Sequence, residues 1–265
     1  GDKPVVDLKP ASFPNEDDFQ RLMERFPQLL TELDGTASRR WILVKREAGV
    51  PDVEGGDDRW SLDHLFLDDE GVPTLVEIKR ASDTRTRREV VAQLLEYAAN
   101  ASKWWTIDRL SEWFLEGKAS DGDHGSLLAR LLEKDDVNWD AYWRSVKANF
   151  GAGRIRLVIV ADIIPVELER IVEFLNEQMT PASFLALELR LFESGSQRIL
   201  APRLIGATAR AFDQKSGDTG YAETVTEWLA LQQSDNRVQP FVERLETAGA
   251  KACVGAARRA RARRA

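Results

Sequence analysis

An aspartate, a glutamate and a lysine lie in two neighbouring apolar segments, separated by a short acidic stretch that contains glycine. This pattern predicts a β-hairpin. If its turn is centred on Glu70, Asp63 lies directly opposite Glu77 on the neighbouring strand. Side chains alternate between the faces of a strand, so Lys79 then shares one face with both carboxylates.

The predicted arrangement suits metal-dependent chemistry. Two directly opposed carboxylates repel each other unless a cation lies between them. Carboxylate oxygens are preferred ligands of Mg²⁺, and Mn²⁺ accepts the same ligands. A lysine beside such a metal suits an anionic substrate and an attacking water molecule. Asp63 and Glu77 are therefore candidate metal ligands, and Lys79 is a candidate catalytic residue.

The pattern Asp-x13-Glu-x-Lys on a hairpin resembles the motif of the PD-(D/E)xK nuclease superfamily, which has the restriction-endonuclease-like fold. On the next predicted helix, Gln93 and Tyr97 resemble the QxxxY motif of the exonuclease-like branch, and residues at i and i+4 share a helix face. The segment around Glu16 is similar to the first helix of several members. The resemblance covers about 12–100 by motif and extends to about 206 by element order.

This resemblance implies a metal-dependent nuclease that hydrolyses phosphodiester bonds in DNA. The implied metal ligands for Mg²⁺ are Asp63, Glu77, the carbonyl group of Ile78, and Glu16. The implied catalytic residues are Asp63, Glu77, Lys79, Gln93 and Tyr97. Lys79 would orient the attacking water or offset charge in the transition state, whereas Gln93 and Tyr97 would position the scissile strand.

The chain departs from the family pattern just before the first carboxylate, where Leu62 replaces the proline. A literal Pro-Asp pair occurs upstream, so Asp52 is the alternative first carboxylate. We prefer Asp63 because it lies in an alternating apolar segment, whereas the segment 50–58 around Asp52 is typical of a loop.

Each feature also has an explanation without catalysis. Glutamate and lysine often pair across a solvated sheet face, and Gln93 and Tyr97 are compatible with ordinary surface and core positions of a helix. An acid such as Glu16 in a first helical turn interacts favourably with the helix dipole. The alternatives are a catalytically inactive nuclease fold that binds nucleic acid or a protein partner, and a structural protein whose hairpin is charged at one end.

Basic residues follow the second predicted strand and could hold phosphates beside the metal. The candidate nucleic-acid-binding residues are Arg80, Arg85, Arg87 and Arg88. The whole chain carries a net charge of −7, which argues against indiscriminate nucleic-acid binding by charge alone. Residues 251–265 contain only basic charges, and Arg258 to Arg264 are expected to form a mobile basic tail.

The elements that position these residues predict an α/β protein with a mixed sheet, in the order of the restriction-endonuclease-like αβββαβ core. The predicted helices cover 16–33 (capped by Asn15), 86–116 (with a bend near 101–102), 125–148 and 165–178. The predicted strands cover 41–45, 60–67, 74–79, 155–161, 183–192 and 199–205, with Leu65 opposite Leu75. We expect a nuclease-like domain over 8–206 with a helical insertion at about 101–150, then a helical appendage with the basic tail over 207–265.

Composition sets the outer limits. The 265 residues are 43% apolar, as in a globular protein. One cysteine excludes an intramolecular disulfide framework, and two histidines argue against a His/Cys zinc site. The chain shows no long apolar run and no signal-peptide pattern, so we expect a cytoplasmic protein with no membrane partner. The expected partner is nucleic acid, with DNA preferred, and a homodimer is compatible with the sequence.

Overall fold

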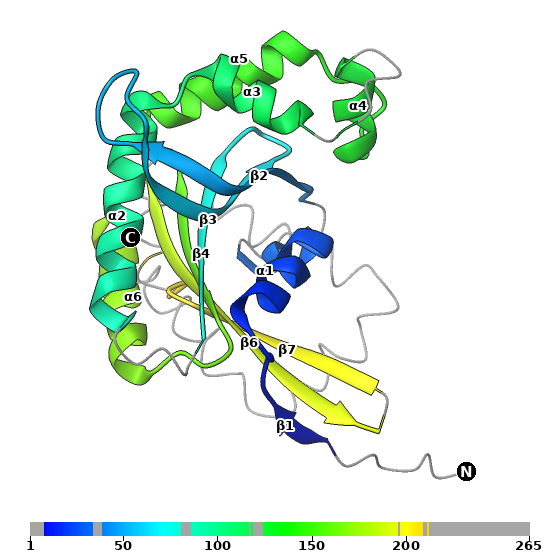
Figure 1. Cartoon of the computed structure of the whole chain (residues 1–265), viewed down its shortest axis with the longest axis vertical. Helices are drawn as coiled ribbons and strands as arrows, with labels where there is room; N and C mark the ends of the chain where they lie inside the picture. The colour runs from blue at the N-terminus through cyan, green and yellow to red at the C-terminus, as the bar shows by residue number, and fades with distance from the viewer. Residues whose placement is uncertain are drawn as a thin grey trace, which may run out of the picture. The chain divides into compact units, whose positions relative to one another are not determined.

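The computed structural model describes residues 8–33, 39–80, 86–116, 118, 124–195, 197–208 and 211. In this part of the chain, seven strands form one mixed sheet with α-helices on both faces (Figure 1). The strands are β1 (Lys9–Ala11), β2 (Trp41–Pro51), β3 (Asp58–Asp68), β4 (Pro73–Lys79), β5 (Arg156–Ala161), β6 (Ser183–Ser194) and β7 (Gln197–Ile205). The helices are α1 (Glu16–Arg25), the 3₁₀-helix η1 (Pro27–Leu33), α2 (Thr86–Trp104), α3 (Ile107–Leu115), α4 (His124–Leu131), α5 (Trp139–Gly151) and α6 (Val166–Gln178). The predicted mixed α/β class is confirmed.

The strands lie in the order β1-β6-β5-β4-β3-β2, and β7 also pairs with β6. The central strand β5 is parallel to both β4 and β6, whereas the remaining pairs are antiparallel. Parallel neighbours need a crossover connection. The segment that contains α2 to α5 connects β4 to β5, and α6 connects β5 to β6.

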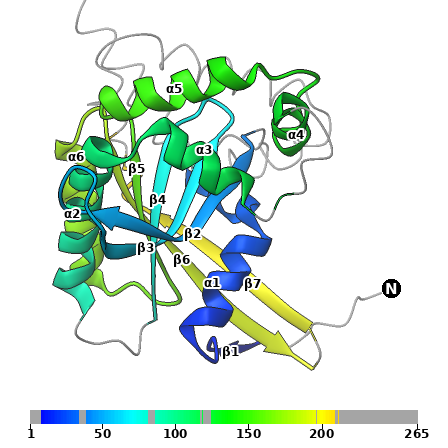
Figure 2. The ribbon, with the colours of Figure 1, turned by 45° about the horizontal axis from the view of Figure 1, so that its top comes forward.

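The two faces of the sheet are covered by different helices (Figures 1 and 2). Leu65 and Leu75 belong to the core that includes Leu94 of α2, whereas Phe66 and Val76 belong to the core that includes Phe19 of α1. Adjacent residues of one strand thus enter opposite cores, as the alternation of side chains requires. The β3–β4 hairpin is therefore packed on both faces.

The predicted register of the hairpin is confirmed, because Leu65 pairs with Leu75. The ladder runs from the turn only as far as the pair His64–Val76. Beyond this pair, β3 continues alongside β2, and β4 continues alongside β5. Asp63 and Glu77 are the next residues after the last pair, so they lie where the two strands separate.

The first helix begins as predicted and ends early. The side chain of Asn15 accepts a hydrogen bond from the backbone N–H of Asp18 at 2.7 Å, which caps α1. The prediction of one helix through residue 33 is wrong, because α1 ends at Arg25 and η1 follows. Pro27 lacks a backbone N–H and disfavours helical geometry at the residue before it, which accounts for the break.

The two long helices predicted after the hairpin are each divided. The break in the first lies after Trp104 rather than near 101–102, and Thr106 caps α3 by accepting from the backbone N–H of Arg109 at 3.2 Å. The second is divided into α4 and α5, where Asn138 caps α5. In both places a capping side chain, rather than the apolar periodicity, decides where a helix begins.

The prediction of a loop over 50–58 is partly wrong. β2 extends to Pro51 and β3 begins at Asp58, so only the residues between them connect the strands. β1 was not predicted, since three residues are too few to show alternation. The remaining strands and α6 follow the predicted order.

The predicted C-terminal appendage and basic tail lie outside the described residues, apart from positions 207, 208 and 211. The chain divides into the units 1–215 and 216–265. Within the described residues, no helix is long and apolar enough to cross a membrane.

A buried carboxylate fixes the turn of the hairpin. Asp68 is 0% exposed, and its side chain accepts hydrogen bonds from Arg39 and Arg156, both at 2.8 Å, and from the backbone N–H groups of Glu70 and Val72. Removal of the Asp68 carboxylate would leave these four donors without their shared acceptor. Asp68 therefore stabilises the turn that sets the register of the two strands.

We expect Asp68→Ala to lower the free energy of unfolding by about 3–5 kcal/mol, because two arginines and two backbone donors lose their shared acceptor. The neighbouring variant Asp69→Ala is the control, since the partly exposed Asp69 should contribute less than about 1 kcal/mol. Urea unfolding measures both. Equal losses in the two variants would contradict the proposed role of Asp68.

Candidate functional site

The structure brings together the acidic pair and the lysine that the sequence singled out. Glu77 is only 3% exposed, and its Oε1 atom lies 2.8 Å from Nζ of Lys79. Within the described residues, Oε2 of Glu77 is buried and has no hydrogen-bond partner. A buried acceptor without a donor is costly, so this atom marks a position where a cation or a proton would stabilise the protein.

Asp63 is held at both oxygens. Its Oδ2 atom accepts a hydrogen bond from the backbone N–H of Ile78 at 2.6 Å, and its Oδ1 atom accepts from the side-chain amide of Gln20 at 2.9 Å. The first contact links β3 to β4 directly beyond the end of their ladder. The carboxylate thus replaces the main-chain pairing that the separating strands lose.

Burial and mutual repulsion disfavour the charged form of both acids. Burial, and secondarily the charge of Glu77, raises the pKa of Asp63 to about 7. Burial also raises the pKa of Glu77, against the attraction of Lys79. Burial alone would lower the pKa of Lys79, yet the nearby carboxylates hold that pKa above its ordinary value. The site therefore combines a fixed positive charge with two acids that are reluctant to ionise together.

The two residues of the predicted QxxxY pattern both lie on α2. Tyr97 is 4% exposed, and its burial, together with the charge of Glu77, raises its pKa to about 12. The charges of Lys79 and Asp63 also act on this pKa, which places the hydroxyl within the electrostatic reach of the acidic pair. Oε1 of Gln93 is buried and has no hydrogen-bond partner in the described part of the chain.

The two remaining predicted metal ligands lie near the pair. Glu16 is the first residue of α1, and its charge acts on the pKa of Asp63, of Glu77 and of Lys79. Ile78 is fully buried and lies between Glu77 and Lys79 along β4, and its backbone N–H donates to Asp63. Among the described residues, no three Asp, Glu, His or Cys side chains converge as a group that could hold a metal ion.

Asp52, the alternative first carboxylate, lies elsewhere. It follows the end of β2, and its Oδ2 atom accepts from Arg59 at 2.6 Å. Asp63 lies five positions after Asp58, the first residue of β3, which is a separation of roughly 17 Å in an extended strand. The acid beside Glu77 is therefore Asp63.

Little of the predicted phosphate-binding cluster is described. Arg80 is half-buried, and its Nε atom has no hydrogen-bond partner within the described residues. Arg85 lies outside the described residues, as do the side chains of Arg87 and Arg88 at the start of α2. These three residues stay sequence predictions.

The donor set suits a hard divalent cation. Two carboxylates lie close together, and an oxygen of Glu77 there is buried without a donor among the described residues. Mg²⁺ is usually held by one or two carboxylates and keeps several water ligands, so the absence of a third acid among the described residues is compatible with it. A cation would also offset the burial and repulsion that raise the pKa of Asp63.

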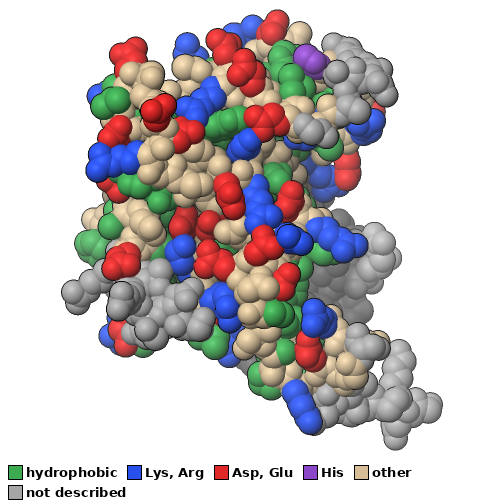
Figure 3. Space-filling view, viewed as in Figure 1, with side chains coloured by type: hydrophobic (Ala, Val, Ile, Leu, Met, Phe, Trp, Pro, Cys, Tyr) green, Lys and Arg blue, Asp and Glu red, His purple; other side chains and the backbone are tan. Residues whose placement is uncertain are grey.

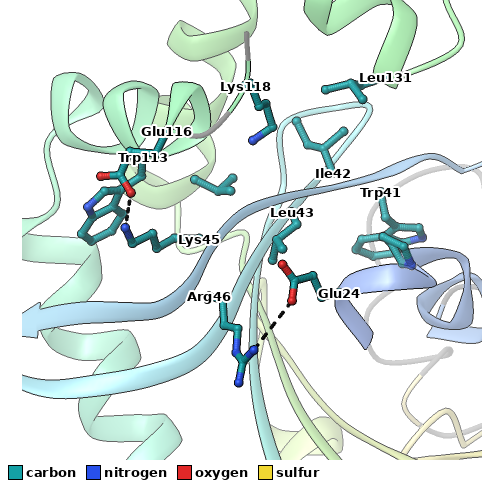
Figure 4. A pocket seen from close by; sticks show the side chains of 12 residues that line it. Glu24, Trp41, Ile42, Leu43, Lys45, Arg46, Trp113, Glu116, Lys118 and Leu131 are labelled. Carbon is teal, nitrogen blue, oxygen red and sulfur yellow. Dashed lines mark hydrogen bonds and ion pairs between the residues drawn. The ribbon is translucent and has the colours of Figure 1, made fainter. Parts of the chain in front are cut away.

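A pocket of about 560 Å³ lies at another place, along β2 (Figure 4). Its lining residues include Trp41, Lys45 and Arg46 of β2, Trp113 of α3, and Glu24 of α1. Lys45 forms an ion pair with Glu116, and Arg46 forms one with Glu24 at 3.8 Å. None of the predicted catalytic residues lines this pocket.

Sequence reasoning missed one residue of the site. Gln20 of α1 binds Asp63 across 43 residues of sequence, and it is 7% exposed. A polar residue on the apolar side of an amphipathic helix was the available signal.

Comparisons of this chain with protein-family models, with curated proteins and with solved structures gave no match.

Proposed function

We propose that this protein is a metal-dependent nuclease with a restriction-endonuclease-like core, and that it hydrolyses phosphodiester bonds in DNA. The observation that carries the proposal is the acidic pair of partly buried Asp63 and buried Glu77, next to Lys79, where β3 and β4 separate. Ionising acids whose pKa values are raised lowers the stability of the folded protein. Such perturbed groups are typical of functional sites.

In this proposal, Asp63 and Glu77 hold Mg²⁺ or Mn²⁺, with Ile78 and Glu16 as further candidate ligands. The metal, when bound, would polarise the phosphate and lower the pKa of a water molecule. Lys79 carries a positive charge beside Glu77, where it can orient that water and offset the negative charge of the transition state. Gln93 and Tyr97 lie on the helix that covers this face and would position the scissile strand.

The charge distribution favours local rather than extended contact with DNA. Acidic and basic side chains are interspersed over the face seen in Figure 3. Broad non-specific binding depends on the neutralisation of many phosphates by lysine and arginine. We therefore propose that binding depends on a few cations beside the site, with Lys79 and Arg80 as the described members.

A catalytically inactive nuclease fold that binds nucleic acid or a protein partner is the second candidate. The finding that favours it is that no three acidic, His or Cys side chains converge as a metal-binding group in the described part of the chain. In that case Lys79 would neutralise Glu77 as part of the fold. Metal-dependent cleavage separates the two candidates.

The direct test is incubation of the full chain with single- and double-stranded DNA and RNA, with Mg²⁺, with Mn²⁺, or with a chelator. We expect cleavage of DNA that requires the metal and that Glu77→Gln abolishes, because the amide is nearly isosteric with the acid but is a poor metal ligand. If wild type and Glu77→Gln cut DNA equally well, the cleavage would come from a contaminant or from another site. If no substrate is cut under any of these conditions, the inactive fold is the better account.

A further inference from the structure

We infer that Gln20 is a positioning residue of the proposed site, and that Arg46 fixes the orientation of its amide. This inference rests on the proposed function, since it concerns how Asp63 is presented to the metal. Gln20 lies on α1, on the opposite side of the sheet from Tyr97 of α2. It reaches Asp63 where β3 and β4 have separated, and it is almost fully buried there.

The chemistry of the partners determines which way the amide of Gln20 points. Nε and Nη2 of Arg46 donate to Oε1 of Gln20 at 3.2 and 2.9 Å. A guanidinium group has only donors, so the amide oxygen must face Arg46. The amide nitrogen then faces Asp63, and it can only donate. The oxygen of Asp63 that faces this amide is therefore the acceptor of the bond.

Arg46 is itself held firmly to the same helix. It forms ion pairs with Asp17 and Glu24 of α1, the second of which is drawn in Figure 4. Asp17, Gln20 and Glu24 are spaced at i, i+3 and i+7 and so share one helix face. Arg46 thus fixes α1 to β2 while it orients Gln20.

Two donors on two different oxygens fix the plane of the Asp63 carboxylate. The backbone N–H of Ile78 holds Oδ2, and the amide of Gln20 holds Oδ1. Each carboxylate oxygen retains a lone pair for a metal. Without Gln20, only the hydrogen bond from Ile78 would hold the carboxylate, which could then rotate about its Cβ–Cγ bond. Metal binding would then have to order the carboxylate. Hydrogen-bond partners of metal ligands commonly affect affinity in this way.

We expect Gln20→Met to weaken Mn²⁺ binding about 10- to 100-fold, a range typical for loss of a partner that orients a metal ligand. Methionine retains the length and apolar stem of glutamine but removes the hydrogen bonds with Asp63 and Arg46. Arg46→Met is the second variant, which releases the amide of Gln20 without removing it, and it should weaken binding in the same direction but less. The affinity is measured by isothermal titration of Mn²⁺ into the full chain, and folding of each variant is checked by circular dichroism.

The matched control is Met23→Ala on the same helix. Met23 is 0% exposed and packs in the core below α1, so this change loosens α1 while it retains the side chains of Gln20, Arg46 and Asp63. We expect it to lower the thermal midpoint and to leave the Mn²⁺ dissociation constant within about twofold of wild type. Equal weakening in Met23→Ala and Gln20→Met would overturn the inference, as would unchanged binding in Gln20→Met. If wild type itself binds no Mn²⁺, the proposed metal site fails, and this inference fails with it.

Discussion

Lys79→Ala should lower the rate of DNA cleavage by about 10²- to 10³-fold, the loss typical when one group that stabilises transition-state charge is removed. The affinity for DNA should change far less, because one cation contributes little to the binding of a polyanion. Single-turnover cleavage and DNA binding with Ca²⁺ in place of the catalytic metal measure the two quantities separately.

The lysine also attracts Glu77, so its removal should raise the pKa of that acid further. The comparison is therefore made at about pH 8.5 with saturating Mn²⁺. Lys103→Ala is the matched control, since it removes one positive charge from an exposed position on α2. If the cleavage rate and the affinity for DNA fell in equal proportion, Lys79 would be a phosphate-binding residue rather than a catalytic one.

A second large effect is expected in the dependence of stability on metal and pH. Mn²⁺ at about 100 times its dissociation constant should raise the stability by about 2.7 kcal/mol, or the thermal midpoint by roughly 5–10 °C. Protons compete for the same carboxylates, because the pKa of Asp63 is raised to about 7. At a fixed Mn²⁺ concentration the shift should therefore be larger at pH 8 than at pH 6.

Without metal, the contribution of Asp63 to stability should show the opposite dependence on pH. The folded state keeps a proton on Asp63 that the unfolded chain loses near pH 4, so this acid contributes stability at low pH that is lost as the pH rises towards 7. His64 acts in the opposite sense, since burial lowers its pKa to about 4. The informative quantity is thus the difference between wild type and Asp63→Asn, both of which contain His64.

Asp63→Asn should remove most of the metal-induced shift. Without metal, the stability of wild type relative to Asp63→Asn should fall as the pH rises from about 4 to 7, because only wild type contains the acid with the raised pKa. Thermal unfolding with and without Mn²⁺ at several pH values measures both effects. A shift of equal size in wild type and Asp63→Asn would place the metal elsewhere.

The central part of the fold could be predicted because local signals agree there. The acidic turn and the alternation around it determine the register that pairs Leu65 with Leu75. Asn15 caps its helix as expected. The first helix division lies a few residues after the predicted bend, where Thr106 caps a new helix. The division before Asn138 was missed, although the charged run over 133–136 was an available signal. The short β1 has too few residues to produce a pattern.

The site was predictable only along the hairpin and α2. Asp63, Glu77 and Lys79 follow from strand alternation, and Tyr97 from helical spacing. The contact of Gln20 with Asp63 depends on where β3 and β4 separate and on how α1 lies against the sheet. Neither property is encoded in a local pattern, and the orientation of Gln20 further requires Arg46 of β2. Sequence therefore indicated the chemistry, whereas the positioning of the carboxylate required the structure.

The most direct test of the proposed site is a crystal structure of the full chain grown or soaked with Mn²⁺, with anomalous scattering used to locate the metal. The proposal predicts an anomalous peak within bonding distance of carboxylate oxygens of both Asp63 and Glu77, and the loss of that peak in Glu77→Gln. An ordered site with no peak at saturating Mn²⁺, or a peak bound only by other residues, would contradict it.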